Sequence, residues 1–324
     1  MSLSPDASAR QRERRALVLL FLAPALWTVN YYVARRAPGV IDPHLLAFGR
    51  WFTAGLIIAA VVPGELWTHR AHIVRDAWRY LVLGALGMLV CGAWVYVGAR
   101  TTEAMNISLI YATSPVMIAL FAAVWLREPF TWRQAVGVAL ALAGVVNVVV
   151  KSDWLALAHV RWVVGDAWIV AATLSWTAYS LLLRKWTSPL GATARLACIA
   201  LGGSVVLLPF AVWEATQAAV SPWTLQSLWL VLLAALIPGV GAYWVHAWTQ
   251  KVLGASRVGT ALYLGPLYSA VMAWAVLDES LGWHHVIGAA LILPGVWLVS
   301  RSVPAKATRA VSPDGADPVT RSIP

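Results

Sequence analysis

Long apolar segments alternate with short polar ones over most of the chain. A helix needs about 20 mostly apolar residues to cross the hydrocarbon core of a membrane. Ten segments approach that length, and they predict membrane-spanning helices over residues 16–34, 44–62, 79–98, 105–126, 132–150, 164–183, 193–213, 228–249, 256–277 and 283–300. Residues 1–15 and 302–324 are polar, which predicts disordered tails at both ends of the chain.

Two parts of the chain match each other when one is shifted by about 150 residues. At a shift of 151 the matched pairs are Pro115/Pro266, Glu128/Glu279, Trp132/Trp283, Gly137/Gly288 and Gly144/Gly295. At slightly smaller shifts, Trp27 matches Trp176 and Arg50 matches Arg195. Each repeat holds five predicted spans, an odd number, so the second repeat enters the membrane from the opposite side. We therefore predict an all-α integral membrane protein with ten transmembrane helices in two inverted five-helix repeats, residues 16–150 and 164–300.

The composition supports a membrane location and excludes a soluble domain. The chain is 60% hydrophobic and 12% charged, whereas a soluble domain has roughly 25% charged residues. The net charge of +10 comes from Lys and Arg that gather in both tails and in every second loop. Because cytoplasmic loops carry excess positive charge, both termini are predicted to be cytoplasmic. The charge thus indicates topology, and no nucleic-acid partner is expected.

The sequence shows no pattern typical of catalysis or of a metal site. Cys91 and Cys198 both lie inside predicted spans, which argues against a disulfide framework. The seven His show no His-Glu-x-x-His spacing, and no Ser or Cys has a base near it in the sequence. We expect no catalytic residue, no metal and no cofactor, and a membrane enzyme is the disfavoured alternative.

The ends of the two repeats carry a family resemblance. Residues 126–144 read Leu-Arg-Glu-Pro…Trp…Gly…Gly, and residues 277–295 read Leu-Asp-Glu-Ser…Trp…Gly…Gly. Together with the opening of the second repeat, residues 165–179, these patterns resemble the EamA-type transporters of the drug/metabolite transporter superfamily. The resemblance covers about residues 16–300. It implies a multi-pass carrier of the bacterial inner membrane that exports amino acids or related metabolites.

The resemblance also implies that the first, third and fourth helices of each repeat line a central cavity. In the first helix, Trp27, Asn30 and Tyr31 are spaced i, i+3 and i+4, and therefore share one face. Polar side chains at membrane depth usually face protein or a water-filled cavity, because lipid cannot satisfy them. Trp also gathers at membrane surfaces, but Trp27 and Trp176 lie near the middle of their spans. We predict that both line the cavity.

An aromatic cavity suits a substrate that carries an amino group. Ring faces attract an ammonium group by cation–π contact, and a Tyr hydroxyl can bond an amino or a carboxylate group. His246 has either a structural role or a role with substrate or protons. The predicted substrate-binding residues are Trp27, Asn30, Tyr31, Trp94, Tyr96, Asn106, Tyr111, Thr113, Trp176, Tyr179, Tyr243, His246 and Tyr263.

Three further pairs of repeated residues lie in or beside the predicted spans. Pro115 and Pro266 each remove a backbone donor, and act either as hinges for alternating access or as packing kinks. Arg50 and Arg195 either snorkel or pair, as a helical Arg near a membrane end commonly does, or recognise a carboxylate. Glu128 and Glu279 precede the fifth and tenth helices, where a carboxylate favours the helix N-terminus, so we interpret them as structural.

The function that these patterns favour is export of amino acids or related small metabolites by alternating access. No Asp or Glu lies in the middle of a predicted span, which argues against exchange of protons for drugs at a membrane carboxylate. Facilitated movement and coupling through His246 or through a carboxylate at the end of a span remain open. Nucleobases, nucleosides and hydrophobic drugs are the alternative substrates. We expect a monomer whose partners are a small-molecule substrate and the lipid bilayer.

Overall fold

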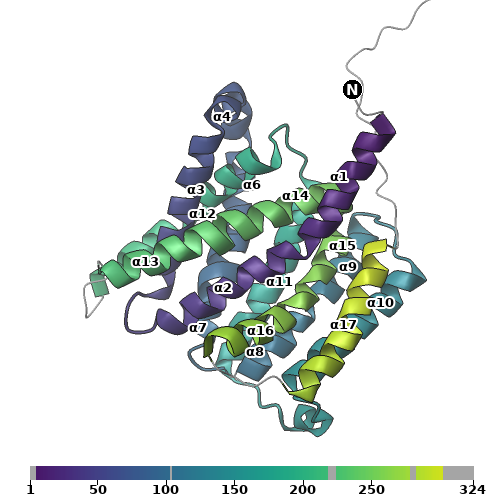
Figure 1. Ribbon diagram of the computed structural model, residues 1–324. Helices are drawn as coiled ribbons and strands as arrows, with labels where there is room; N and C mark the ends of the chain where they lie inside the picture. The colour runs from purple at the N-terminus through teal and green to yellow at the C-terminus, as the bar shows by residue number, and fades with distance from the viewer. Residues whose placement is uncertain (1–4, 103, 218–223, 278–281, 302–324) are drawn as a thin grey trace, which may run out of the picture.

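The computed structural model describes residues 5–102, 104–217, 224–277 and 282–301, and every regular element in these ranges is a helix (Figure 1). The prediction of an all-α protein is confirmed for the described part of the chain. Five helical segments are long and apolar enough to cross a membrane: Pro43–Val61, Ala77–Gly98, Trp132–Val149, Ala192–Gln217 and Leu225–Leu253. Two shorter apolar segments are Leu109–Trp125 and Trp283–Val299.

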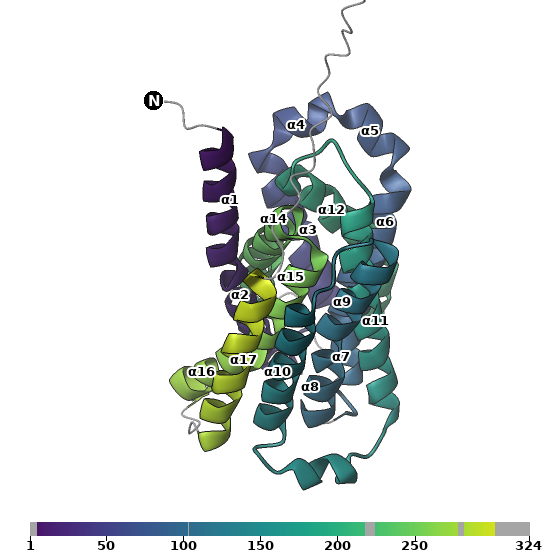
Figure 2. The same ribbon diagram turned by 90° about the vertical axis from the view of Figure 1, so that its right-hand side faces the viewer.

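The described residues of the first repeat and of the tail before it form ten α-helices and one π-helix. They are α1 (Pro5–Leu20), α2 (Leu22–Arg36), α3 (Pro43–Val61), α4 (Pro63–Thr68), α5 (Arg70–Arg75), α6 (Ala77–Gly84), the π-helix η1 (Ala85–Ala93), α7 (Trp94–Gly98), α8 (Ala104–Ala112), α9 (Ser114–Trp125) and α10 (Trp132–Val149). The short helices α4 and α5 form an arch at one end of the molecule (Figure 2).

In the linker and the second repeat, the part of the chain that the structure describes forms seven α-helices, two 3-10 helices and a second π-helix. They are the 3-10 helix η2 (Trp154–His159), α11 (Val164–Lys185), α12 (Ala192–Gln217), α13 (Leu225–Ala234), the π-helix η3 (Ala235–Ala242), α14 (Tyr243–Leu253), α15 (Ala255–Thr260), the 3-10 helix η4 (Ala261–Leu264), α16 (Gly265–Leu277) and α17 (Trp283–Arg301). The segment that contains η2 lies at the end of the molecule opposite the arch (Figure 2).

The repeated glycines bring α10 and α17 into close contact. A Cβ atom on Gly137 would lie 2.6 Å from the carbonyl oxygen of Gly295, and a Cβ on Gly144 would lie 2.9 Å from the oxygen of Gly288. The numbering rises along one helix as it falls along the other, so α10 and α17 run antiparallel. Gly137 therefore contacts Gly295, which is the repeat counterpart of Gly144. Gly144 in turn contacts Gly288, which is the repeat counterpart of Gly137. Small residues at such positions let helix backbones approach closely in a membrane.

Two carboxylates join α3 and α12 in a reciprocal manner. Glu214, near the end of α12, accepts the backbone N–H groups of His44 and Leu45 at the start of α3, at 2.8 and 3.0 Å. Glu65, which follows α3, accepts the N–H of Gly191 just before α12, at 2.5 Å. Each carboxylate therefore satisfies orphan donors at the positive end of the opposite helix.

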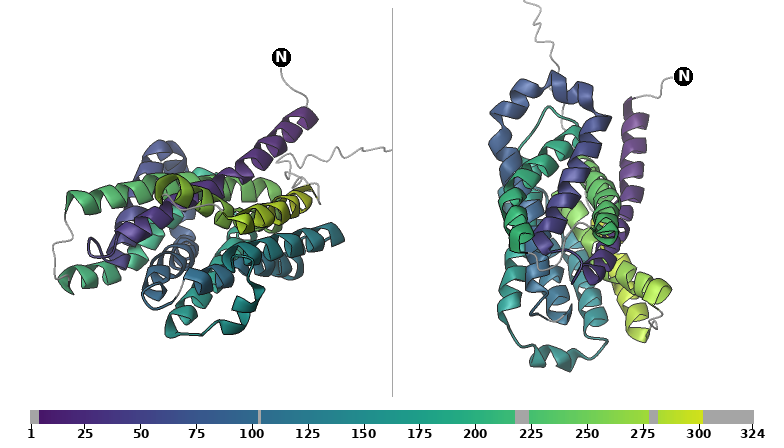
Figure 3. Two further views of the ribbon diagram at one scale, coloured as in Figure 1. Left: turned by 60° about the horizontal axis from the view of Figure 1, so that its bottom comes forward. Right: turned by 90° about the vertical axis from the view of Figure 1, so that its left-hand side faces the viewer.

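The N-terminal part of the chain differs from the prediction. Residues 5–20 form helix α1, although residues 1–15 were expected to be a disordered tail. Ala16 and Leu20 are buried against the end of α14, and Glu13 pairs with Arg257 at 3.2 Å. This apolar face and ion pair order the segment, whose outer end projects beyond the other helices (Figure 3).

The predicted spans 16–34, 105–126 and 256–277 are interrupted. The first divides between α1 and α2 at Phe21, since Pro24 in the first turn of α2 has no N–H for a bond to Leu20. The second divides between α8 and α9 just before Pro115. The third contains η4 just before Pro266. Both repeated prolines therefore lie in the first turn of a new helix, and their role as hinges stays a prediction.

Glu128 has the structural role that was predicted, but at a different helix. Its carboxylate accepts the backbone N–H of Ala255 at 3.3 Å, at the start of α15, and pairs with Arg184 at 3.4 Å. The start of α10 is capped instead by Thr131 and Gln134. Glu279, its repeat counterpart, lies outside the described residues.

We expect Gly137→Ala to destabilise the protein by about 1–3 kcal/mol, because the added methyl group forces α10 away from α17. Thermal unfolding of the purified protein in detergent measures the effect. Gly64→Ala is the matched control, since nothing lies within 4 Å of a Cβ at that position in α4. The control should be neutral or slightly stabilising. Equal melting temperatures for both variants would contradict this packing.

Replacing Glu128 by Gln should lower thermal stability by about 1 kcal/mol, because α15 and Arg184 lose a negative charge. Transport per folded molecule should be retained. Arg184→Gln and the double variant complete a cycle that isolates the ion pair from the helix cap. Complete loss of transport in correctly folded E128Q protein would show that Glu128 takes part in transport itself.

Candidate functional site

Aromatic rings from both repeats meet at the centre of the molecule. The ring of Trp27 in α2 lies 5.5 Å from Trp176 in α11 and 5.5 Å from Tyr243 in α14, both edge to face. The ring of His246 lies 5.2 Å from both tryptophans. Two more rings complete what we call the central aromatic cluster, which comprises Trp27, Trp51, Trp176, Tyr179, Tyr243 and His246.

Tyr243 connects the remaining rings of the cluster. Trp51 of α3 packs edge to face against it, with ring centres 4.6 Å apart. Tyr179 stacks on Trp176 at 5.2 Å and also faces Tyr243 at 6.3 Å. Edge-to-face and offset-stacked pairs are the arrangements that aromatic rings prefer. The rings therefore form one packed unit that joins α2, α3, α11 and α14.

The π-helix η1 anchors the rings of the second repeat to the first. The hydroxyl of Ser175 donates to the carbonyl oxygen of Leu86 at 2.8 Å, and the hydroxyl of Tyr243 donates to that of Gly87 at 3.4 Å. A Cβ atom on Gly87 would lie 3.0 Å from the ring of Tyr179. Glycine at this position thus makes room for the stacked ring. Insertions of the π type within helices occur frequently at functional sites, and η3 occupies the matching place in the second repeat.

A polar group adjoins the central aromatic cluster. The side-chain oxygen of Asn30 accepts hydrogen bonds from the hydroxyl of Tyr96 at 3.0 Å and from Nη1 of Arg50 at 3.2 Å. The guanidinium carbon of Arg50 lies 4.5 Å from the ring centre of Trp51 and 6.0 Å from that of Tyr243. Arg50 therefore links Asn30 and Tyr96, both predicted site residues, to the cluster.

Four other predicted site residues make contacts with residues outside the central aromatic cluster. Trp94 packs on Trp168 of α11 at 5.1 Å, and Tyr111 hydrogen bonds the side chain of Cys91. Thr113 is exposed, and its hydroxyl donates to a carbonyl of its own chain segment. Tyr263 is 1% exposed and packs in a separate cluster with residues of α10 and α17. The side chains of Tyr31 and Asn106 lie outside the described part of the structure.

Sequence reasoning missed Trp51 as a site residue and treated Arg50 mainly as a helix-end residue. Trp27 was selected because it is an aromatic residue near the middle of a predicted span. The same criterion would have selected Trp51. Both residues lie near the middle of α3, and Trp51 is completely buried. Their contacts with Tyr243 depend on how helices of the two repeats pack, which the spacing within one helix does not reveal.

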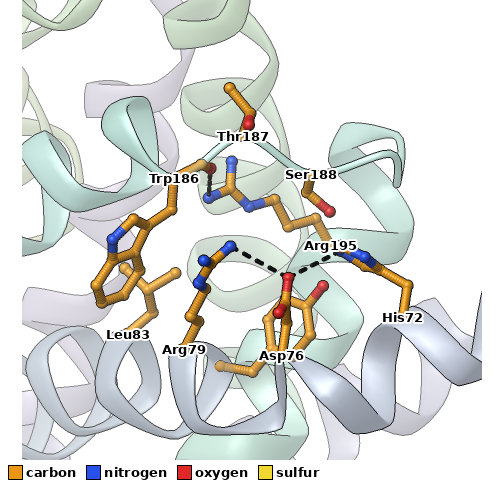
Figure 4. Close-up of a pocket in the computed structure, with 9 residues that line it drawn as sticks. His72, Asp76, Arg79, Leu83, Trp186, Thr187, Ser188 and Arg195 are labelled. Atoms are coloured by element: carbon orange, nitrogen blue, oxygen red, sulfur yellow. Dashed lines mark hydrogen bonds and ion pairs between the residues drawn. The ribbon is translucent and has the colours of Figure 1, made fainter.

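A small hollow near the arch is lined by charged groups (Figure 4). Asp76 accepts from Arg79 at 3.1 Å and lies 3.2 Å from Nε2 of His72. Arg195 donates to the carbonyl oxygen of Trp186 at 2.6 Å. Asp76 pairs with Arg79 and His72, and Arg195 bonds carbonyl oxygens at the end of α11, so we assign the hollow to the architecture. Among the described residues no group of three His, Cys, Asp or Glu side chains could hold a metal ion.

The arrangement is that of a membrane-embedded helical transporter, in which aromatic and polar side chains from the first and second halves of the chain meet. The sequence model of the EamA-like transporter family matches residues 14–150 and 163–301, and the chain belongs to this family.

Related proteins agree with this membership. An uncharacterized transporter of Archaeoglobus fulgidus is 27% identical over 289 residues, which cover 87% of this chain and 96% of that protein. A protein of Streptantibioticus cattleyicolor named as a probable terminal-alkyne amino-acid exporter is 29% identical over 264 residues, covering 81% and 85%. One crystal structure aligns with a TM-score of 0.69 at 18% identity over 88% of this chain and 96% of its own, which shows a shared fold.

Proposed function

We propose that the protein exports amino acids or related small metabolites across the bacterial inner membrane by alternating access. The observation that carries this proposal is the central aromatic cluster, to which α2 and α3 of one repeat and α11 and α14 of the other contribute rings. A site between two repeats becomes accessible from either side when one repeat moves against the other. Trp27 contacts three rings of the second repeat, so such movement changes its contacts directly.

The chemistry of the cluster favours a substrate that has both an apolar part and an amino group. Buried ring faces hold apolar surface and attract an ammonium group by roughly 1–2 kcal/mol when water is excluded. His246 adds a buried ring nitrogen, Nε2, that no described residue hydrogen bonds and that can therefore bond a substrate. The name of the Streptantibioticus cattleyicolor relative points to the same class of substrate.

The proposal includes the topology of ten spans in two inverted repeats, with both termini in the cytoplasm. The antiparallel contact of α10 with α17 supports it, because repeat counterparts meet across a pseudo-twofold axis. The reciprocal carboxylates of α3 and α12 support it in the same way. Since both repeats come from one chain, a monomer suffices for the carrier.

The interruptions before Pro115 and Pro266 are the elements that we propose to move. Each proline separates two helical segments at the same position of its repeat. Helix segments joined at such a point can change their relative angle without breaking the hydrogen bonds within either segment. The two points would then give each repeat a matched hinge.

Reconstitution in liposomes tests the function. Vesicles loaded with a panel of labelled amino acids should lose at least one of them faster than protein-free vesicles do. A parallel panel of nucleobases, nucleosides and hydrophobic cations tests the alternative substrates. Flux of a purine without flux of any amino acid would overturn the proposal.

Substitutions within the cluster locate the site in the same assay. Trp176→Ala should reduce transport at least tenfold, because the substrate loses a ring that touches four others. Trp229→Ala is the matched control, since this side chain of α13 is 61% exposed and should leave transport unchanged. Equal transport by both variants would place the substrate elsewhere.

A further inference from the structure

Arg50 is a cation within an apolar helix. It lies near the middle of the 19-residue helix α3, roughly 10 Å along the axis from Pro43 at 1.5 Å per residue. The residue is only 5% exposed, and α3 is one of the segments that can cross a membrane. A charge at this depth is costly and is retained mainly where it has a function.

The partners of Arg50 within the structure are all neutral. Nη1 donates to the side-chain oxygen of Asn30, which also accepts a hydrogen bond from the Tyr96 hydroxyl. The rings of Trp51 and Tyr243 lie near it, and Nε is buried without a hydrogen-bond partner. Within the described ranges, no carboxylate lies at ion-pair distance from Arg50. A buried charge without a counter-ion is the costly case.

The repeat counterpart Arg195 has a different environment. Its two terminal nitrogens donate to the carbonyl oxygens of Leu183 and Trp186, at 2.8 and 2.6 Å, and its Nε also lacks a partner. These carbonyls end α11, where the negative end of the helix stabilises a cation. Arg195 therefore caps the C-terminal end of α11. Arg50 reaches Asn30 inside α2 instead, so the two repeats differ at the very point where Arg50 adjoins the central aromatic cluster.

We propose that Arg50 binds the carboxylate group of the transported molecule. The planar guanidinium can form paired, charge-assisted hydrogen bonds to a carboxylate. Asn30 and Tyr96 hold it in place, and Tyr243 connects it to the rings that receive the rest of the substrate. The substrate class is then a small carboxylic acid with an apolar or amino-bearing part. This inference rests on the proposed function and deepens it.

The first experiment compares an acid with its uncharged analogue on the unmodified protein. Binding to purified protein in detergent is measured by quenching of tryptophan fluorescence, for the amino acid that is transported best and for its carboxamide. The acid should bind at least tenfold more tightly, because the carboxamide cannot neutralise Arg50. Equal affinities would overturn the role of Arg50 without any variant being made.

The second experiment uses matched variants at the two repeated arginines. Arg50→Gln should reduce the acid-to-amide affinity ratio to about one, and Arg50→Lys should restore part of it. Arg195→Gln should lower the yield of folded protein but leave the ratio unchanged, because Arg195 closes α11. Only monodisperse protein is compared, and the ratio does not depend on how much of it folds. An unchanged ratio in R50Q would overturn the assignment.

A third set of ligands separates this inference from the proposed function. The panel includes carboxylic acids that have no amino group and nucleosides that have no carboxylate. Arg50-dependent flux of carboxylic acids without flux of amino acids would retain the role of Arg50 and reject amino-acid export. Amino-acid export that is unchanged in R50Q would retain the proposed function and reject the role of Arg50. Flux of nucleosides alone would reject both.

Discussion

Close contact between helix backbones is the constraint on which this structure depends. Lipid tails are as apolar as the helix surfaces, so the hydrophobic effect does not drive helices to associate within a membrane. Packing and hydrogen bonds must hold them together. The glycine pairs 137/295 and 144/288 bring α10 and α17 together, while Gly84 and Gly203 bring α6 to α12. Gly87 makes room for Tyr179 in the same way. The helices that carry the central aromatic cluster are positioned by these contacts and by the helices around them.

Charges in this molecule divide into two kinds. Glu65, Glu128, Glu214 and Arg195 satisfy helix ends, where backbone donors or acceptors lack partners inside their own helix. Such groups stabilise the structure and leave no charge for a substrate. Arg50 is of the other kind, since among the described residues its partners are the Asn30 amide and the rings of Trp51 and Tyr243. The contrast between two arginines at equivalent positions of the repeat therefore points to function.

Residue spacing could predict the parts of the structure that follow from a single helix or from the repeat. The repeated glycines and the mid-span positions of Trp27 and Trp176 can be read from the sequence, whereas the contacts that these residues make depend on how the helices pack. The π-helices could not be predicted, because their composition is that of any apolar helix. The spacing could not show that α1 is ordered, because this depends on its contact with α14. The partners of Arg50, Trp51 and Tyr263 likewise depend on how different helices pack.

The central claim is that the substrate binds where the two repeats meet, with its carboxylate on Arg50. An experimental structure of the protein with a transported amino acid tests this most directly. The account predicts ligand density against the rings of Trp27 and Trp176, with carboxylate oxygens within hydrogen-bond distance of the Arg50 guanidinium. Density at another place, such as the hollow beside Asp76 and Arg195, with Arg50 still bound only to neutral groups, would contradict it.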